Sequence, residues 1–122
     1  MIPTPSRILV ARDPIDFRKQ IEGLAAVAEV HLGEEPLDGT LFVFRNRRKT
    51  AAKLLVWTYG GFLLLYKKLE RGQFSWPQLD GDRGTITPAE LAALLEGIDL
   101  TRSRRLSRWN PENTRAPGPE SG

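Results

Sequence analysis

Residues 40–57 read TLFVFRNRRKTAAKLLVW, and this stretch decides the fold. Its two ends, Thr40–Phe44 and Lys53–Trp57, are rich in aromatic, leucine and β-branched side chains, which is typical of β-strands. Between them lies a short and strongly basic connection, Arg45-Asn46-Arg47-Arg48-Lys49. A connection this short joins antiparallel neighbours, so the stretch predicts a β-hairpin with a basic tip.

The following residues extend this hairpin into an antiparallel meander. Tyr59–Gly61 predicts a turn, because paired glycines permit positive φ, and Phe62–Leu69 predicts the third strand. Glu70–Gly72 predicts another turn, which leads to Phe74–Trp76. We expect Phe74–Trp76 to be an edge strand, because Pro77 cannot donate a hydrogen bond within a sheet.

Helices are predicted on both sides of the meander in the sequence. Ile8–Ala11 predicts a short N-terminal strand, and Pro14–Leu32 predicts one long amphipathic helix. Its apolar residues recur at steps of three and four: Phe17, Ile21, Leu24, Ala28 and Leu32. After the meander, residues 78–84 predict a polar loop. Thr87–Glu90 is a capping box, which predicts a short helix that ends at Gly97.

These elements predict a single α+β domain over residues 1–100. Its expected architecture has two layers, with an antiparallel β-meander of three to four strands packed against one long helix. A short N-terminal strand and a short C-terminal helix complete it. A chain of 122 residues is long enough for one such domain. Residues 101–122 are basic and then rich in proline and glycine, which predicts a disordered tail.

The net charge of +3 is unevenly distributed along the chain. Residues 1–44 contain 4 Lys/Arg and 7 Asp/Glu, a net charge of −3. Residues 45–122 contain 14 and 8, a net charge of +6. An acidic first third followed by a basic remainder suggests one surface that binds a polyanion.

The basic residues that could contact DNA phosphates come from two segments of the meander. The end of the third strand should lie beside the start of the second, so the two segments could merge into one patch. The candidates are Arg45, Arg47, Arg48, Lys49, Lys53, Lys67, Lys68 and Arg71. The alternative is that these charges only keep a hairpin tip and a sheet edge soluble.

Motifs of enzymatic chemistry are missing from the sequence. The chain has no cysteine, which excludes disulfides, thiolate zinc sites and thiol catalysis and fits a reducing cytoplasm. His31 is the single histidine, and the acidic residues fall at helix caps, in turns such as Asp80–Asp82 or on exposed helix faces. We therefore predict no catalytic residues, metal, cofactor or small-molecule substrate. No apolar run approaches the ~20 residues that span a membrane.

Several collinear segments between Ile8 and Asp99 together resemble a known family. This is the TnpB accessory protein, or second-open-reading-frame-like, family of the insertion sequence 66 group of bacterial transposable elements. The segments are Asp16–Lys19, Gly23-Leu24, Gly39–Arg48, Lys53–Trp57, Gly61-Phe62, Tyr66–Gly72, Phe74–Pro77 and Leu94–Asp99. The chain departs from the common family pattern at Gln20, where glycine is frequent, and at Thr58, where aspartate is frequent.

The resemblance implies a non-catalytic accessory protein for DNA transposition, which is encoded beside a separate transposase. We expect it to bind element-end DNA through the basic hairpin and to assist that transposase in the cytoplasm. The alternative is a protein-interaction module that binds the transposase without contacting DNA. Its surface would be the Phe74–Trp76 strand, or Trp57, Tyr59 and Phe62 if these side chains project outward.

Overall fold

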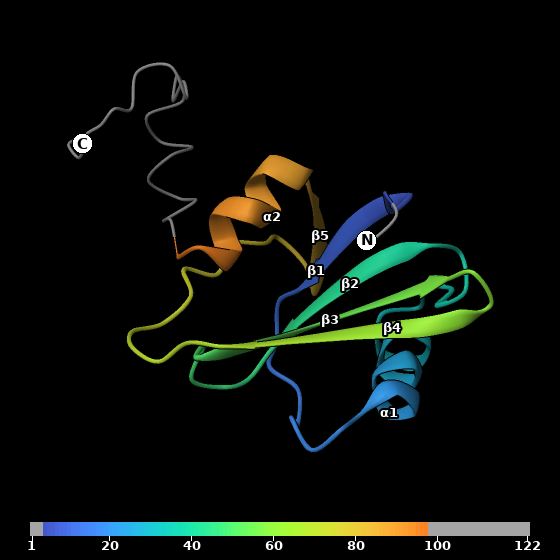
Figure 1. The fold of residues 1–122 in the computed structure, drawn as a ribbon, viewed down its shortest axis with the longest axis horizontal. Helices are drawn as coiled ribbons and strands as arrows, with labels where there is room; N and C mark the ends of the chain where they lie inside the picture. The colour runs from blue at the N-terminus through green and yellow to red at the C-terminus, as the bar shows by residue number, and fades with distance from the viewer. Residues whose placement is uncertain (1–3, 98–122) are drawn as a thin grey trace.

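The computed structural model of the protein describes residues 4–97, and Figure 1 shows how their elements are arranged. The chain begins with a strand, crosses to its neighbour through a helix, continues through a hairpin and ends on a second helix. In chain order the elements are β1 (Arg7–Ala11), α1 (Ile21–Ala26), the π-helical turn η1 (Val27–His31), β2 (Thr40–Arg45), β3 (Ala51–Thr58), β4 (Gly61–Lys68), β5 (Arg83–Ile86) and α2 (Pro88–Leu95). The predicted tail at residues 101–122 lies outside the described residues.

One five-stranded mixed sheet with the order β4-β3-β2-β1-β5 forms the centre of the fold. β2, β3 and β4 are antiparallel neighbours, with Leu55 paired to Phe42 on one side and to Leu64 on the other. β1, however, runs parallel to β2, because the helical segment between them carries the chain back along the sheet. β5 pairs antiparallel with β1 at the second edge. The predicted sheet, a meander of three to four strands, is therefore wrong, because the antiparallel strands β2–β4 are only part of a mixed five-stranded sheet.

The sequence indicates strand β1 clearly and strand β5 only weakly. Ile8–Ala11 of β1 is buried throughout, and a continuous apolar run is typical of a strand that is covered on both faces. β5 has a weaker signal, because Ile86 is its single buried side chain and Gly84 lies within it. Pairing with β1 nevertheless satisfies those backbone groups of this short strand that face β1.

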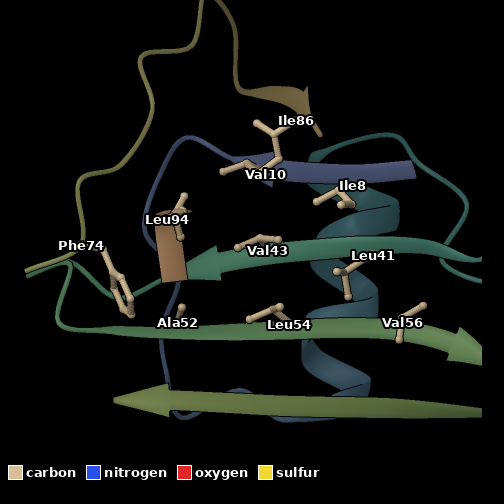
Figure 2. Packing of buried hydrophobic residues seen from close by; sticks show 10 residues of the cluster. All are labelled: Ile8, Val10, Leu41, Val43, Ala52, Leu54, Val56, Phe74, Ile86 and Leu94. Carbon is tan, nitrogen blue, oxygen red and sulfur yellow. The ribbon is translucent and has the colours of Figure 1, made fainter. Parts of the chain in front are cut away.

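The helices cover opposite faces of the sheet, so the protein has three layers and not the predicted two (Figure 1). On the face that we call the α1 face, α1 and η1 bury Leu24, Val27 and Ala28 against Leu9, Phe42, Phe44 and Leu55. On the opposite α2 face, Leu94 packs near Phe74 and the strand residues Val10, Val43, Ala52 and Leu54 (Figure 2).

The C-terminal helix α2 begins as the sequence predicts. The hydroxyl of Thr87 accepts a hydrogen bond from the backbone N–H of Glu90, with a donor–acceptor distance of 3.1 Å. The carboxylate of Glu90 accepts one from the N–H of Thr87 at 2.9 Å, and Pro88 occupies the first helical position. This reciprocal pair satisfies two backbone donors that the helix leaves free.

The segment that connects β4 to β5 is not the edge strand predicted at Phe74–Trp76. These residues form no strand, and Phe74 is buried in the core of the α2 face. The indole Nε1 of Trp76 donates a hydrogen bond to the carbonyl oxygen of Ala11 at 2.7 Å. Both aromatic side chains therefore anchor the connection to the sheet, and the interaction surface predicted on this strand does not form.

The predicted long helix over Pro14–Leu32 is also wrong, because helical structure spans only Ile21–His31. The residues before it have other hydrogen-bond partners. The Asp16 carboxylate accepts from the backbone N–H of Arg18, and the ammonium of Lys53 binds the carbonyl oxygens of Phe17 and Lys19. In a helix that began at Pro14, those two carbonyl groups would accept from N–H groups four residues later.

We predict that Gln20→Ser stabilises the protein by about 1 kcal/mol, measured as the free energy of unfolding in urea. Gln20 occupies the N-cap of α1 in an extended conformation, and its side chain makes no capping hydrogen bond. A serine hydroxyl at this position can accept from the N–H of Glu22 or Gly23. Gln20→Ala is the control, because it offers no acceptor. An equal gain for both variants would contradict the capping argument.

Candidate nucleic-acid interface

The loop between β2 and β3 is held in shape by the side chain of Asn46. Its Oδ1 accepts hydrogen bonds from the backbone N–H groups of Thr50 and Ala51 at 2.9 and 3.2 Å. Its Nδ2 donates to the hydroxyl of Thr50 at 2.8 Å. Lys49 completes the turn with a φ of 62°, a left-handed conformation that non-glycine residues adopt infrequently. The side chain of Asn46 and the backbone of Lys49 thus define the shape of the loop.

The residues after β4 are bonded directly to this loop. The register places Lys68 opposite Ala51, and the N–H of Leu69 donates to the carbonyl of Thr50 at 2.9 Å. The N–H of Phe74 donates to the carbonyl of Lys49 at 2.7 Å, and Nε2 of Gln73 donates to that of Arg48 at 2.8 Å. The structure therefore brings the two basic segments together at one end of the sheet.

Five of the eight predicted residues form a cluster at this end, which we call the basic end. Four of them have exposed side chains, and none of these four takes part in an ion pair within residues 4–97. Lys49 is partly exposed. The basic end consists of Arg47, Arg48, Lys49, Lys68 and Arg71. Their positive charges face solvent, where a polyanion can reach them.

Arg45 supports the loop from within. Its guanidinium donates to the carbonyl oxygens of Arg12 and Asn46 at 3.1 and 3.2 Å. It also lies 5.9 Å from the centre of the Trp76 ring, within the range of a cation–π contact. Burial lowers the pKa of Arg45, and this effect is partly opposed by the charge of Asp13. These contacts hold the guanidinium in place against the backbone.

Lys53 is buried, with 1 % of its surface exposed. Its Nζ donates to the carbonyl oxygens of Phe17 and Lys19 at 2.9 and 2.8 Å. It also lies 5.0 Å from the centre of the Phe17 ring and 5.4 Å from that of Tyr66. The ammonium is therefore enclosed and cannot reach a phosphate group. Lys67 differs again, because its exposed side chain donates to the carbonyl of Leu95 at the end of α2.

We predict that Lys53→Met lowers the free energy of unfolding by about 3 kcal/mol, because it leaves two carbonyl groups without their charged donor. Methionine fills a similar volume, so the change tests the hydrogen bonds more than the packing. Lys67→Met is the matched control, since it removes an ammonium that is exposed and bonded to one carbonyl. We expect a loss within about 1 kcal/mol for the control. Equal losses in urea denaturation would contradict the role assigned to Lys53.

A cavity of about 370 Å³ lies apart from the basic end, beside η1, and three aspartates line it together with His31. Each carboxylate is bonded to an arginine one or two positions away in sequence: Asp13 to Arg12, Asp16 to Arg18 and Asp82 to Arg83. The bonds from Arg18 hold the pKa of Asp16 well below its ordinary value, and the bond from Arg12 lowers that of Asp13. Across residues 4–97, no group of three or more His, Cys, Asp or Glu could hold a metal ion.

Sequence reasoning overlooked Asn46, the residue that shapes the basic loop. An asparagine between two strands is a known turn signal, because its side chain bonds to nearby backbone groups. Here the basic neighbours of Asn46 dominated the interpretation. Gln73 was overlooked as well. Its hydrogen bond to the loop depends on a contact between residues 25 positions apart, which the local sequence does not show.

Comparison with known proteins adds to this geometry. The model of a family described as IS66 Orf2 like protein matches residues 6–105. The chain belongs to this family. It therefore belongs with proteins associated with the transposition of insertion sequences.

Two relatives of the chain come from Sinorhizobium fredii, and both are named as uncharacterized proteins. The protein y4hO is 39 % identical over 106 residues, which cover 86 % of this chain and 90 % of the relative. The protein y4jC is 36 % identical over 99 residues, which cover 81 % and 85 %. No solved structure matches the chain. In the part that the structure describes, no helix is long and apolar enough to cross a membrane.

Proposed function

We propose that this IS66 Orf2-like protein is a non-catalytic accessory factor that binds the DNA of its element and assists a separately encoded transposase. Family membership supports the link to transposition. The observation that carries the DNA-binding part is the basic end, where five cations come from two segments that are hydrogen-bonded to each other. Such a role would place the protein in the cytoplasm, together with bacterial DNA.

The shape of the basic end favours contacts with phosphates over reading of bases. β2 and β3 are both interior strands of the sheet, so their ribbon cannot enter a groove by itself. The loop with Arg47 and Arg48 connects the two strands at the basic end. Arginine and lysine at such a tip neutralise phosphates and release counterions, which gives affinity without sequence specificity.

The sequence beyond the described residues adds to the same argument. The side chain of Lys67 bonds to Leu95 at the end of α2, so the chain leaves the described part close to the basic end. The next 11 residues after Gly97 include Arg102, Arg104, Arg105 and Arg108. We propose that these arginines add phosphate contacts to those of the basic end.

The first test measures the affinity for element-end DNA at several salt concentrations. For the full chain, we expect log K to fall steeply with log salt, by about 0.9 for each phosphate neutralised. Replacing Arg47, Arg48 and Arg71 with alanine should reduce this slope by about 3. Their replacement with lysine keeps the charge and should preserve most of the slope. Lys49 is left unchanged, because a substitution at its positive φ would change the backbone strain of the loop as well as the charge.

Arg7→Ala is a control away from the basic end. It removes one positive charge at the start of β1, the end of that strand away from the basic end, where Arg7 forms an ion pair with Glu34. We expect the salt slope to stay unchanged. Absence of any salt-dependent binding by the full chain would refute the proposal. Capture of the transposase under those conditions would instead support a protein-interaction module, with the 93 %-exposed Tyr59 as the first residue to replace.

A further inference from the structure

β4 is an apolar edge strand, and no other described strand pairs with its outer edge. It is the outermost strand of the sheet, next to β3, and Figure 2 shows it below that strand. All of its residues are at least partly exposed, whereas the first six residues of β3 are buried. Five consecutive apolar residues, Phe62-Leu63-Leu64-Leu65-Tyr66, occupy its middle. Soluble proteins usually protect such an edge with charges, proline or a covering segment.

The backbone of β4 has a definite set of free hydrogen-bonding groups. Tyr59-Gly60 closes a two-residue hairpin, so the pair Thr58–Gly61 is hydrogen-bonded and the pairs alternate from there. The bond from Leu69 N–H to the Thr50 carbonyl falls in the same alternation. The N–H and C=O groups of Phe62, Leu64 and Tyr66 therefore point away from β3. These are the groups that a further strand would bind.

We propose that β4 pairs antiparallel with β4 of a second copy of this chain, across a two-fold axis at Leu64. The apolar segment has the same pattern in both directions, with an aromatic residue at each end and three leucines between. In this register Phe62 lies opposite Tyr66 of the second copy, Leu63 opposite Leu65 and Leu64 opposite Leu64. Cross-strand pairs of this kind are the stabilising contacts of a sheet.

The aromatic pairs of the α1 face would be extended across such an interface. Phe62 contacts Trp57 with 5.0 Å between ring centres, and Tyr66 contacts Phe17 with 5.8 Å. The two-fold axis is perpendicular to the sheet, so the α1 faces of both copies lie on the same side. Pairing Phe62 with Tyr66 of the second copy would join these two aromatic pairs into one row.

The distribution of charges and the alternation of free backbone groups along β4 both favour this register over the neighbouring registers. With the axis at Leu64, Lys67 and Lys68 lie opposite Gly61 and Gly60 of the second copy, which carry no charge. With the axis at Leu65, Phe62 would lie opposite Lys68. A parallel arrangement in register would place the lysines of both copies beside one another, which is unfavourable. The chain's own segment after Gly97 is a poorer occupant, because its arginines would lie near the same lysines.

The test compares the full chain with Leu64→Lys and Leu64→Glu by sedimentation over a range of concentrations. We expect the unchanged chain to reach twice the chain mass. Each variant alone should sediment at the chain mass, because two like charges meet at the axis. An equimolar mixture should regain the doubled mass, since lysine then meets glutamate. Damage to the fold alone would not be repaired by mixing.

Val30→Lys is the matched control, because it removes an equally apolar side chain that is 74 % exposed on η1. It should leave the doubled mass unchanged. A chain mass for the unchanged protein at every concentration overturns the proposal. So does a doubled mass that both Leu64 variants retain when tested alone.

Hydrogen exchange identifies the occupant of the edge independently of the variants. Self-pairing predicts that the amides of Phe62, Leu64 and Tyr66 exchange more slowly as the concentration of the protein rises. Protection that does not depend on concentration, in a protein that sediments at the chain mass, would mean that the chain's own terminal segment covers β4, and it would overturn the proposal. The inference does not depend on DNA binding, since both measurements are made without DNA.

Discussion

The enclosed ammonium of Lys53 is the constraint on which the arrangement of α1 and the sheet depends. A buried charge is costly unless it is fully bonded, and here the acceptors are the backbone carbonyl groups of Phe17 and Lys19. Those groups are available only if residues 17–20 are not helical. The helix therefore starts at Ile21, and the segment before it stays at the sheet, where Ile15 N–H bonds to the carbonyl of Arg45.

Local pattern was enough to predict the central hairpins of the fold. The predicted strands Thr40–Phe44, Lys53–Trp57 and Phe62–Leu69 correspond to β2, β3 and β4, and the capping box at Thr87 starts α2. In these segments, turn residues and runs of apolar, aromatic and β-branched side chains specify the structure locally. The position of β1 beside β2 and β5 could not be derived in this way. It depends on which distant strands satisfy one another's backbone groups, and Arg83–Ile86 carries little apolar signal.

For the candidate site, too, the sequence shows the local features but not the contacts between distant residues. Counting charges found the basic loop, but it could not show which cations are already engaged. Arg45 and Lys67 bond to carbonyl groups contributed by residues 33 and 28 positions away. Lys53 did leave a signal, because it is one charge among the otherwise apolar side chains of a buried strand. A charge at such a position more often has an internal partner than a ligand.

The open edge and the basic end are linked by the geometry of β4. Lys68 lies four residues beyond Leu64, so a two-fold axis at Leu64 would separate the two copies of Lys68 by about 27 Å along the strand direction. The loops around Arg48 would lie further apart, toward opposite ends of the joined sheet. One turn of B-DNA is about 34 Å, so a dimer of this kind presents two basic ends at a spacing similar to that of successive grooves on one side of a duplex. A monomer offers one such end, and under the proposed function its five cations alone would give weak and strongly salt-dependent binding. Self-pairing of β4 would thus make two weak phosphate contacts act together on one molecule of DNA, which raises affinity without any base-specific contact.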